Sequence, residues 1–474
     1  MPKNTKEVLV LGAGLAGLSA SLELVKAGYK VTVLERFDFI GGLAATFEKD
    51  KFRFDTGPHR WFAKSDMVNK WMINLMDDEL IKVKRLTRIY FDGKYFYYPI
   101  RLKNALFGIG PIQAVKAVLD YAIYRVRARI LKPRIVSLED GYINQFGKTL
   151  YNTFFNRYSE KLWGRKNTQI SADWIGQRTR GFNILTVIKD ALFKSRNVVS
   201  FVDEFLYPDR GVGRIAEKMA ERVRNKGGKV ILNARVVGFE AKNDKIEGVQ
   251  VLINGKKKLF KADEYINTIP ITILVQTLTP KPPKEIIDAS KTLKYRAEVQ
   301  VTLFVDREKI SPDVWIYVHP KEISFMRFME MDNWSPKMQP KGKTAIVFEV
   351  ACNEGDKMWN KSDKELIEIV KNDYIKEFKT VTKEQILGGY VHRVPYEYPV
   401  YHIGYMIPLE KIKKYLSKYA NFQTIGRNGI FRYNNMDHSI EMGLYAAWNI
   451  VEGKGKYDVD SVNIEREYLE EKKT

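Results

Sequence analysis

A glycine-rich turn near the N-terminus constrains the fold of this chain more than any other feature. Residues 7–11 (Glu-Val-Leu-Val-Leu) are expected to form a short buried strand, and Gly12, Gly14 and Gly17 follow it. The first glycine permits a tight turn, the second lets the backbone approach a pyrophosphate, and the third lets strand and helix pack closely. The helix that follows offers free N–H groups to phosphates. The pattern therefore predicts a dinucleotide-binding unit.

The next segment completes this unit. A helix is expected to run to about Ala27, where Gly28 ends it, and residues 30–34 are expected to form a second strand. Glu35 ends that strand, at the position where a ribose hydroxyl needs an acceptor. The alternative for Glu35 is a solvated residue at a strand end. The glycine pattern alone is weak, and its position between a strand and a helix strengthens it.

Three further segments favour FAD over NAD as the dinucleotide. Gly41 and Gly42 come six residues after Glu35, where the chain of flavoproteins passes close to the flavin. Residues 229–237 are expected to lay a strand and a loop beside the adenine. Residues 426–429 (Gly-Arg-Asn-Gly) precede a C-terminal helix, whose N-terminus would face the flavin edge that carries negative charge when reduced. We therefore predict one noncovalently bound FAD.

The order of these segments predicts an α/β protein with interleaved domains. We expect a Rossmann-type FAD-binding domain that is discontinuous, because nucleotide-binding segments recur at both ends and in the middle of the chain. Its predicted parts are residues 1–75, 205–275 and 420–474. Residues 76–204 are predicted to be a mostly helical cap, and residues 276–419 a β-rich substrate domain with a mixed or antiparallel sheet.

Several elements can be placed within these regions. Asn243-Asp244 and Asn254-Gly255 are expected to be turns between strands. Further strands are expected at 299–305, 314–318, 345–350 and 422–425. Helices are expected near 363–378 and 436–452.

Composition limits the classes of partner and of location. Cys352 is the only cysteine, which excludes a disulfide within the chain and argues against a cysteine metal site, and no other metal site is expected. We see no signal peptide and no apolar stretch that could span a bilayer, so a cytoplasmic location is expected. The formal charge of +22 favours anionic partners, although a lysine-rich proteome would give the same charge. No nucleic-acid module is recognisable, so we expect no nucleic-acid partner.

Together these segments resemble the FAD enzymes that include amine oxidases, protoporphyrinogen oxidases, phytoene desaturases and UDP-galactopyranose mutases. The middle and C-terminal motifs are most similar to the mutases. Residues 157–164 (Arg-Tyr-Ser-Glu-Lys-Leu-Trp-Gly) resemble their Tyr-Thr-Glu-Lys-Gln-Trp-Gly stretch. Residues 426–427 and 431–438 resemble their Gly-Arg…Tyr-Lys-Tyr-Tyr-Asp-Met-His segment without a gap.

The resemblance implies roles for individual side chains. Arg178 and Arg327 would bind the substrate pyrophosphate, Arg178 after one inserted residue in the alignment. Tyr398 and Tyr433 would contact the phosphates, and His59 would lie beside the flavin. The implied catalytic residues are Arg178, Arg327, His59, Tyr398 and Tyr433. The implied substrate-binding residues, of which Tyr158 and Trp163 would line the uridine end, are Tyr158, Trp163, Arg178, Arg296, Arg327, Tyr398 and Tyr433. The candidate cofactor-binding residues are Gly12, Gly14, Leu15, Ala16, Gly17, Glu35, Arg36, Gly41, Gly42, Leu43, His59, Val236, Val237, Gly426, Arg427, Tyr433, Asn435, Met436 and Ile440.

Each of these residue types also has an ordinary structural role. A single arginine is more often part of a surface ion pair, Tyr158 and Trp163 could be core aromatics, and His59 could be a packed, hydrogen-bonded histidine. Two arginines without partners in one cleft would be costly, so a bound anion is expected to pair with Arg178 and Arg327.

The chain also departs from the mutases. Phe62 stands where they carry a second histidine, and Leu43 follows Gly41-Gly42 where they carry asparagine. Residues 170–174 and 205–208 are closer to relatives of the protoporphyrinogen-oxidase type. These differences leave the flavin prediction in place and leave the sugar open.

The preferred interpretation is a mutase that interconverts pyranose and furanose forms of a nucleotide sugar, a small anionic substrate such as a UDP-sugar. The resemblance implies that reduced FAD acts as the nucleophile, while the protein supplies positioning and charge stabilisation. The alternative is an FAD-dependent oxidoreductase of the protoporphyrinogen oxidase or amine oxidase type. That enzyme would need an apolar cavity over the flavin and no diphosphate clamp. The oligomeric state and the electron donor stay open.

Residues 111–130 carry a separate hypothesis. Pro111 suits the start of a helix, and apolar residues recur along one stripe from Ile112 to Ile130. Five basic residues crowd its C-terminal end, namely Arg125, Arg127, Arg129, Lys132 and Arg134. This composition permits peripheral docking at the inner face of an anionic membrane. The alternative is a core-facing helix with a solvated basic end.

Overall fold

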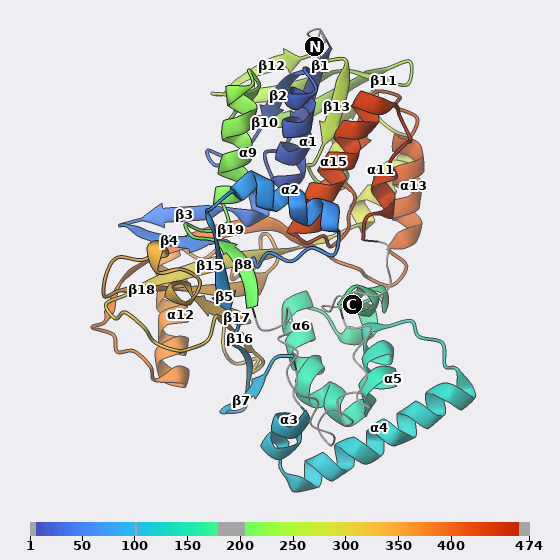
Figure 1. Cartoon of the computed structure of the whole chain (residues 1–474). Helices are drawn as coiled ribbons and strands as arrows, with labels where there is room; N and C mark the ends of the chain where they lie inside the picture. The colour runs from blue at the N-terminus through green and yellow to red at the C-terminus, as the bar shows by residue number, and fades with distance from the viewer. Residues whose placement is uncertain (1–5, 100–101, 179–203, 464–474) are drawn as a thin grey trace.

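The computed structural model describes residues 6–99, 102–178 and 204–463. A body built around a parallel sheet lies at the top of Figure 1, a larger β-sheet with one long helix lies at the lower left, and a group of helices lies at the lower right. Among the described residues, no helix combines the length and the apolar character needed to cross a bilayer.

The upper body is a Rossmann-type sheet. Its five strands are all parallel and lie in the order β20-β13-β1-β2-β9. Their bounds are β1 (Glu7–Leu11), β2 (Lys30–Leu34), β9 (Lys229–Ile231), β13 (Glu264–Asn267) and β20 (Phe422–Thr424). Three separated parts of the chain thus contribute to one sheet, as the interleaved arrangement predicts.

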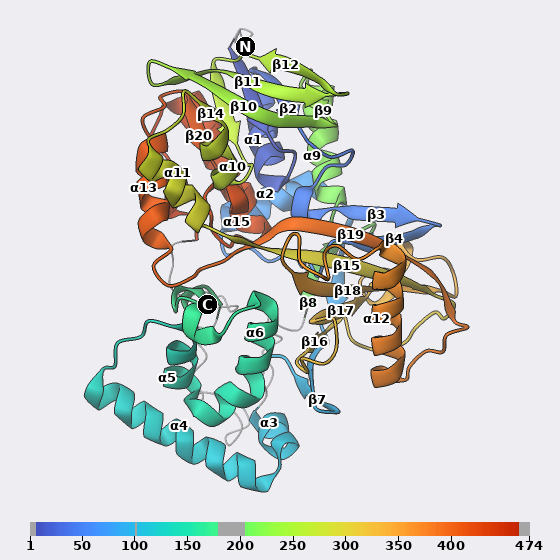
Figure 2. The ribbon, with the colours of Figure 1, turned by 180° about the vertical axis from the view of Figure 1, so that it is seen from behind.

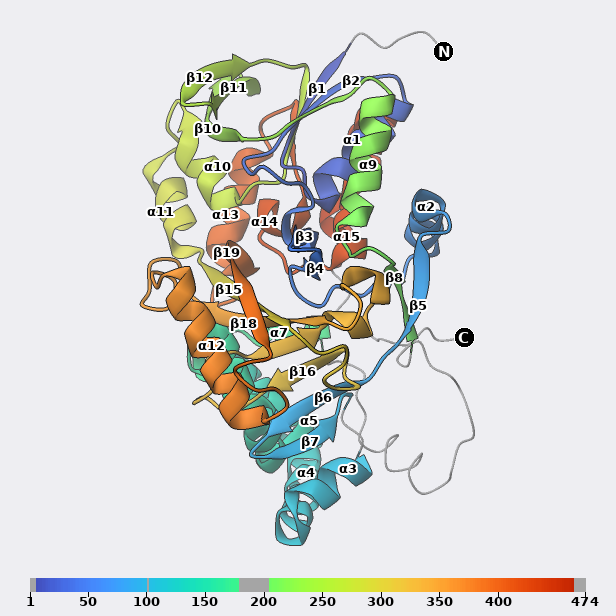
Figure 3. The same cartoon turned by 90° about the vertical axis from the view of Figure 1, so that its left-hand side faces the viewer.

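Helices cover one face of this sheet and a second sheet covers the other (Figures 1–3). The helices are α1 (Leu15–Lys26), α9 (Arg214–Asn225) and α15 (Met436–Glu452). The second sheet has the order β12-β11-β10-β14, from β10 (Ala234–Lys242), β11 (Lys245–Ile253), β12 (Lys256–Phe260) and β14 (Leu278–Thr279). Ser19 Oγ on α1 donates to Ile440 O on α15 at 3.2 Å, which joins the first and last helices.

Both predicted turns are confirmed. Asn243 and Asp244 have positive φ between β10 and β11, and Asn254 and Gly255 have positive φ between β11 and β12. Positive φ at both central residues is the two-residue hairpin turn that asparagine, aspartate and glycine favour.

The β-rich part is a mixed seven-stranded sheet in the order β19-β15-β18-β17-β16-β6-β7. Its strands are β6 (Thr87–Phe91), β7 (Lys94–Tyr97), β15 (Tyr295–Val305), β16 (Trp315–Val318), β17 (Arg327–Glu330), β18 (Thr344–Cys352) and β19 (Ile386–Pro399). The helix α12 (Asp363–Phe378), which was predicted near these bounds, packs against it. All pairings are antiparallel except the one between β6 and β16.

The prediction of a mostly helical region is wrong for its first part. Residues 80–97 form β5 (Leu80–Lys84), β6 and β7, and the last two of these strands extend the β-rich sheet. Helices begin at Leu102 and continue as α3 (Leu102–Ile109), α4 (Pro111–Leu131), α5 (Leu138–Tyr151), α6 (Arg157–Trp163) and α7 (Asp173–Arg178). We therefore propose the same three domains, with β6 and β7 assigned to the substrate sheet. They are the FAD-binding domain (1–75, 205–275 and 420–474), the cap (76–204) and the β-rich substrate domain (276–419).

Candidate functional site

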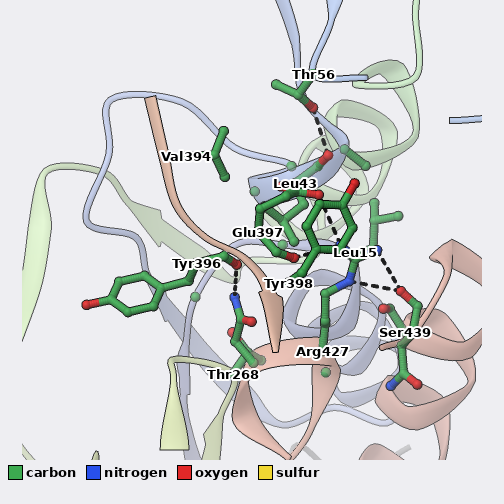
Figure 4. A pocket seen from close by; sticks show the side chains of 18 of the residues that line it. Leu15, Leu43, Thr56, Thr268, Val394, Tyr396, Glu397, Tyr398, Arg427 and Ser439 are labelled. Carbon is green, nitrogen blue, oxygen red and sulfur yellow. Dashed lines mark hydrogen bonds and ion pairs between the residues drawn. The ribbon is translucent and has the colours of Figure 1, made fainter. Parts of the chain in front are cut away.

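A cavity of about 970 Å³ lies between the Rossmann-type sheet and the β-rich sheet. One side is lined by the turn before α1, the end of β2 and the loop at 41–44. The other side is lined by residues of β16, β17, β18 and β19. Figure 4 shows Glu397, Tyr398 and Arg427 close together in this cavity, near Leu15 and Leu43.

Two glycines of the phosphate turn (Gly12 to Gly17), Gly12 and Gly14, line the cavity, but only Gly14 has room for a Cβ. A Cβ on Gly12 would lie 2.1 Å from Thr268 Oγ1, and one on Gly17 would lie 2.1 Å from Gly12 O. A Cβ on Gly14 would come no nearer than 4.0 Å to any protein atom, the closest being Gly41 O. The space before Gly14 therefore fits a group that approaches the backbone closely, as a pyrophosphate does.

The start of α1 is suited to an anion. Gly14 is the N-cap and provides no side-chain hydrogen bond, and Leu15 and Ala16 line the cavity. The first amides of a helix lack partners within the helix and carry the positive end of its dipole. The first turn of α1 thus offers backbone donors where the glycine pattern predicts phosphate.

Glu35 is buried and bonded to backbone, so it is not a solvated strand end. Its Oε2 accepts from Ala13 N at 2.8 Å and its Oε1 accepts from Phe37 N at 3.1 Å. Burial raises the pKa of Glu35 above its ordinary value, against the effect of these hydrogen bonds. Both bonds hold the carboxylate at the cavity, where each oxygen keeps capacity to accept from a hydroxyl group.

The segment 229–237 lies beside this carboxylate. Glu35 N donates to Ile231 O at 2.9 Å, and Ala234 N donates to Glu35 O at 2.7 Å. Val236 and Val237 line the cavity, as do Arg36, Gly41, Gly42 and Leu43. These contacts bring the segment to the cavity beside Glu35, and its place beside the adenine stays a prediction.

Residues near the C-terminus close the cavity from a third direction. Gly426, Arg427, Tyr433, Asn435 and Met436 all line it. The guanidinium of Arg427 donates to Asn434 O at 2.8 and 3.0 Å, and lies 4.7 Å from the Tyr433 ring centre. Arg427 therefore fixes the loop that leads into α15, besides facing the cavity.

Two predicted cofactor residues do not line the cavity. Gly17 faces the protein, where it lets α1 pack against the phosphate turn. Ile440 is fully buried on α15, and its carbonyl accepts the Ser19 hydroxyl. Both positions serve packing behind the site rather than contact with a ligand.

Arg327 has a partner within the protein. Its Nε and Nη2 bind the two carboxylate oxygens of Glu349, with Nη2 to Oε1 at 2.7 Å. The expectation that a bound anion is needed to pair Arg327 is therefore wrong, because a buried carboxylate already neutralises its charge. Arg178 ends α7, and its side chain lies outside the described residues.

A charged cluster joins the β-rich side of the cavity to the C-terminal segment at Arg427, and three of its members are glutamates that the sequence analysis missed. It consists of Glu298, Arg327, Glu349, Glu397 and Arg427. The three carboxyl groups are buried, and Arg427 Nη1 binds Glu397 Oε1 at 3.2 Å. The signal was present in the sequence, since a glutamate within an apolar strand segment, such as Ala-Ile-Val-Phe-Glu349-Val, is unusual.

The members of the charged cluster differ in protonation. Burial raises the pKa of Glu397 to about 7, even though Arg427 favours its charged form. Burial and the neighbouring carboxylates raise the pKa of Glu298 well above its ordinary value, and its Oε2 has no hydrogen-bond partner among the described residues. Burial therefore favours the protonated form of Glu298, and Glu397 can gain or lose a proton near neutral pH. No metal-binding group of three or more ligands occurs within residues 6–99, 102–178 and 204–463.

His59 and Tyr398 also reach the cavity. His59 Nδ1 lies 3.0 Å from Gly57 O, and because a carbonyl only accepts, the proton resides on Nδ1 and Nε2 is an acceptor. Burial and the nearby Arg427 lower the pKa of His59 to about 3, so the ring is neutral at physiological pH. Tyr398 stacks on Tyr433 with ring centres 5.7 Å apart.

Three predicted substrate residues do not line the cavity. Trp163 is buried and meets Trp174 edge to face, with ring centres 4.7 Å apart. Arg296 is buried too, and its Nε donates to Leu162 O at 2.8 Å, which holds the end of α6. Tyr158 lies behind the cavity, in edge contact with the lining residue Tyr317 at 5.5 Å. The structure therefore gives all three residues packing contacts behind the site.

An aromatic wall that the sequence analysis missed lines the same side of the cavity. It consists of Arg85, Tyr98, Trp315 and Tyr317. The Arg85 guanidinium lies 5.2 Å from the Trp315 ring centre, and the rings of Tyr98 and Tyr317 are 5.0 Å apart. Planar rings beside a guanidinium suit a planar, anionic ligand. The overlooked sequence signal was Asp92-Gly93 between two segments in which apolar and polar residues alternate. This pattern strongly indicates a β-hairpin.

Comparison with known proteins places the chain among flavin enzymes. The profile of the family described as "Flavin containing amine oxidoreductase" matches residues 15–450. The crystal structure of a reduced UDP-galactopyranose mutase superposes with a TM-score of 0.83 at 19% identity, over 98% of this chain and 97% of that one. A putrescine oxidase bound to putrescine superposes with a TM-score of 0.62 at 16% identity, over 95% and 100%.

Curated relatives come from more than one branch. A 15-cis-phytoene desaturase of Oncidium hybrid cultivar is 26% identical over 300 residues, which are 60% of this chain and 50% of that protein. A "Probable UDP-galactopyranose mutase" of Klebsiella pneumoniae is 25% identical over 187 residues, 38% of this chain and 47% of that protein. The chain thus spans about half the length of these relatives, and the structural likenesses at low identity show the fold alone.

Proposed function

Because the chain belongs to the family of flavin-containing amine oxidoreductases, we propose that it binds FAD and interconverts ring forms of a nucleotide sugar. The observation that carries this proposal is the set of side chains on the β-rich side of the cavity. The charged cluster and the aromatic wall offer ion pairs and planar rings, which suit a sugar joined to a nucleoside diphosphate.

The first side of the cavity fits FAD. The first turn of α1 would hold the pyrophosphate, Glu35 a ribose, and residues 234–237 the adenine. Leu43, His59 and Met436 also line this cavity and would lie near the flavin ring. Bound and reduced, FAD would supply the nucleophile for the exchange.

The second side would bind the substrate. Tyr98, Tyr317 and Arg85 line the cavity, so the two rings would contact a nucleobase and the guanidinium would bind the diphosphate. Glu349 engages Nε and Nη2 of Arg327, so Nη1 is the group with which Arg327 would donate to the substrate. Pairing with Glu349 would thereby orient Arg327 before the substrate arrives.

Changing the ring form of a sugar moves protons between hydroxyl groups. Glu397 lines the cavity, and its pKa of about 7 is matched to accepting and returning a proton near neutrality. We propose this role for Glu397. Neutral His59, with Nε2 free of its proton, would accept a hydrogen bond at the same end of the cavity.

A second candidate is an FAD-dependent oxidoreductase. Its support is the match to phytoene desaturases, which extends over more residues than the match to the Klebsiella mutase. An oxidoreductase for an apolar polyene needs an apolar chamber, whereas this cavity contains the buried ion pairs of Arg327 and Arg427. The mutase is therefore our preferred proposal.

One experiment separates the two candidates. The purified protein is reduced with dithionite without oxygen, mixed with a panel of UDP- and dTDP-sugars, and searched for ring-contracted products by NMR. Oxygen uptake is measured separately with amines, porphyrinogens and polyenes. Ring-form exchange that requires reduction supports the mutase. Oxidative turnover without any sugar product rejects it, and a colourless protein that takes up no added FAD rejects both.

A substrate-side variant sharpens this test. We expect Arg85→Ala and Arg178→Ala to weaken nucleotide-sugar binding while the protein keeps its yellow cofactor. Arg53→Ala serves as the matched control, because it removes an exposed ion pair between Arg53 on β4 (Phe52–Asp55) and Glu48. Equal affinity in all three variants would contradict the proposed substrate side.

A further inference from the structure

The helix α4 stands at the opposite end of the molecule from the Rossmann-type sheet (Figures 1 and 3). It packs on α5 through a narrow face, in which Ala117 is 1% exposed and Tyr121 is 8% exposed. Asp120 Oδ2 on α4 accepts a hydrogen bond of 2.6 Å from Thr149 N, near the C-terminal end of α5. One face of α4 is therefore fixed to the protein.

Eight large apolar side chains of α4 are 48–82% exposed, and most of them lie on the face opposite α5. They are Ile112, Val115, Val118, Leu119, Ile123, Val126, Ile130 and Leu131. A residue advances about 100° around a helix, so Ile112, Leu119, Ile123, Val126 and Ile130 fall within about 60° of one another. Ala117 and Tyr121 fall on the far side. The alternative of a core-facing stripe is therefore wrong, because this stripe faces solvent.

Basic residues border the stripe. Residues 111–134 contain six basic residues and one acidic residue, Asp120, a net charge of +5. Lys116 and Arg127 lie on one side of the stripe and Arg129 on the other, by the same rotation of about 100° per residue. All three are exposed, as are Lys132 and Arg134 beyond the helix end.

We propose that α4 is a docking site for an anionic phospholipid bilayer, with the helix lying in the plane of the interface. Apolar side chains of one face would enter the region between headgroups and acyl chains, and the basic side chains on both flanks would meet anionic headgroups. Each basic residue near such a surface strengthens binding about fivefold.

Charge decides between a membrane and a second copy of the chain. Two α4 helices packed through their stripes would bring two segments of +5 together, and the single acidic residue of each segment, Asp120, is already bonded to Thr149 N. An anionic bilayer also provides an apolar region for the stripe, and its surface charge is opposite to that of α4. Its complementarity to α4 is therefore both apolar and electrostatic.

Flotation with vesicles tests the proposal on the full chain. We expect binding to vesicles that contain phosphatidylglycerol, loss of that binding at high salt, and little binding to pure phosphatidylcholine. Leu119→Asp combined with Ile123→Asp should weaken binding by roughly a hundredfold, since two apolar groups no longer insert. Ile407→Asp is the control, because Ile407 on α13 (Met406–Leu416) is 64% exposed but lies outside α4.

A label on the stripe tests the orientation of the helix. Cys352 is the only cysteine and is buried, so an Ile123→Cys variant can be labelled selectively with a polarity-sensitive dye. We expect its emission to shift to the blue with phosphatidylglycerol vesicles, and expect no shift from the same dye at Ile407→Cys. A shift at both sites would overturn an orientation set by α4.

Three other results would overturn the proposal. The first is absence of vesicle binding by the folded wild-type chain. The second is equal binding to neutral vesicles at any salt concentration. The third is a dimer in sedimentation that the Leu119→Asp and Ile123→Asp pair breaks while vesicle binding is unaltered, because a second copy would then cover the stripe. Circular dichroism on each variant verifies that the fold is retained, as expected for exposed positions.

Discussion

The two sides of the cavity present different kinds of chemical group. On the Rossmann side the groups are mostly backbone, at Gly14, at the first amides of α1 and around Glu35. On the β-rich side they are side chains, and the buried pairs Arg327–Glu349 and Arg427–Glu397 hold one another in place. Ligand binding on the Rossmann side should therefore depend on the size of a substituted side chain. The stability of the charged cluster should instead depend on whether a substitution changes its charge.

The largest expected effect comes from filling the space before the backbone of Gly14. Gly14 has φ of −75°, which any residue adopts, and a Cβ there would lie 4.0 Å from its nearest protein neighbour, Gly41 O. We expect Gly14→Val to fold normally and to lose FAD affinity by at least about a hundredfold, since the pyrophosphate can no longer approach. Flavin absorbance per protein and the Tm of the cofactor-free protein measure the two properties.

Gly17→Ala provides the contrast to Gly14→Val. Its added methyl group would lie 2.1 Å from Gly12 O, so we expect a lower Tm even without cofactor. If Gly14→Val retained its yellow cofactor, the pyrophosphate would not pass this glycine, and the assignment of the Rossmann side would fail.

The next effect concerns the ion pair of the charged cluster. Removal of one partner of a buried pair leaves an uncompensated charge, so Glu349→Leu should lose about 3–5 kcal/mol of unfolding free energy. Arg327→Met with Glu349→Leu should regain most of this loss, because no charge is left unpaired. Urea unfolding of both single variants and the double variant measures the coupling.

Binding distinguishes stability from function in the same three variants. We expect the double variant to keep FAD and to lose nucleotide-sugar affinity, because Nη1 of Arg327 is absent. A double variant with wild-type affinity for UDP-sugars would show that this pair serves the fold alone, and would remove Arg327 from the proposed substrate side.

A third prediction concerns pH. Burial raises the pKa of Glu397 to about 7 from an ordinary value of 4.5, so the folded state holds the proton more tightly than the unfolded chain. Its stabilising contribution is therefore full below pH 4.5 and is lost as the pH rises to about 7. One pKa unit corresponds to about 1.4 kcal/mol, so the loss amounts to about 3 kcal/mol or less.

Glu397→Gln isolates this contribution, because glutamine does not titrate and can still accept from Arg427. We expect the variant to lose less stability than the wild type between pH 4.5 and 7, as measured by urea unfolding at a series of pH values. Other buried acids titrate in both proteins and cancel in the difference. Parallel pH profiles in the two proteins would contradict a raised pKa at Glu397.

Local features of the sequence predicted the Rossmann side. The strand, turn and helix of residues 7–34 form within one stretch of chain, and the glycine spacing acts over six residues. Helices 363–378 and 436–452 were likewise predicted with the bounds that the structure has. Hydrophobic periodicity and capping residues are local, so a single sequence is enough to place such elements.

The charged cluster depends on contacts that a local pattern does not contain. Glu298 and Glu349 meet because β15 and β18 pair in one register, in which Gln300 lies opposite Glu349. A slip of one residue would turn Glu349 to the other face of the sheet. Glu397 comes from a third strand, β19, which pairs with the other edge of β15. The sequence showed each glutamate, but only the register brings them together.

The resemblance to known motifs was least reliable for aromatic residues. Trp163 lies in a motif attributed to the substrate, yet the structure buries it against Trp174. Burial of an aromatic ring contributes to stability whether or not a ligand is present, and a motif does not tell these two reasons apart. Tyr98 and Tyr317 line the cavity from segments in which no motif was recognised.

The smallest expected effect compares two hairpin turns, one on each side of the cavity. Gly93, between β6 and β7, has φ of +78°, and Gly255, between β11 and β12, has φ of +74°. A Cβ at either position would meet nothing within 4 Å, so alanine should cost only the backbone strain of about 1 kcal/mol in each case. Urea unfolding should therefore show equal losses of unfolding free energy for Gly93→Ala and Gly255→Ala.

Only Gly93→Ala should also weaken nucleotide-sugar binding, by a few fold, because the β6–β7 hairpin leads directly into Tyr98 of the aromatic wall. Equal binding in the two variants would mean that the aromatic wall is held by the rest of the sheet and not by its hairpin.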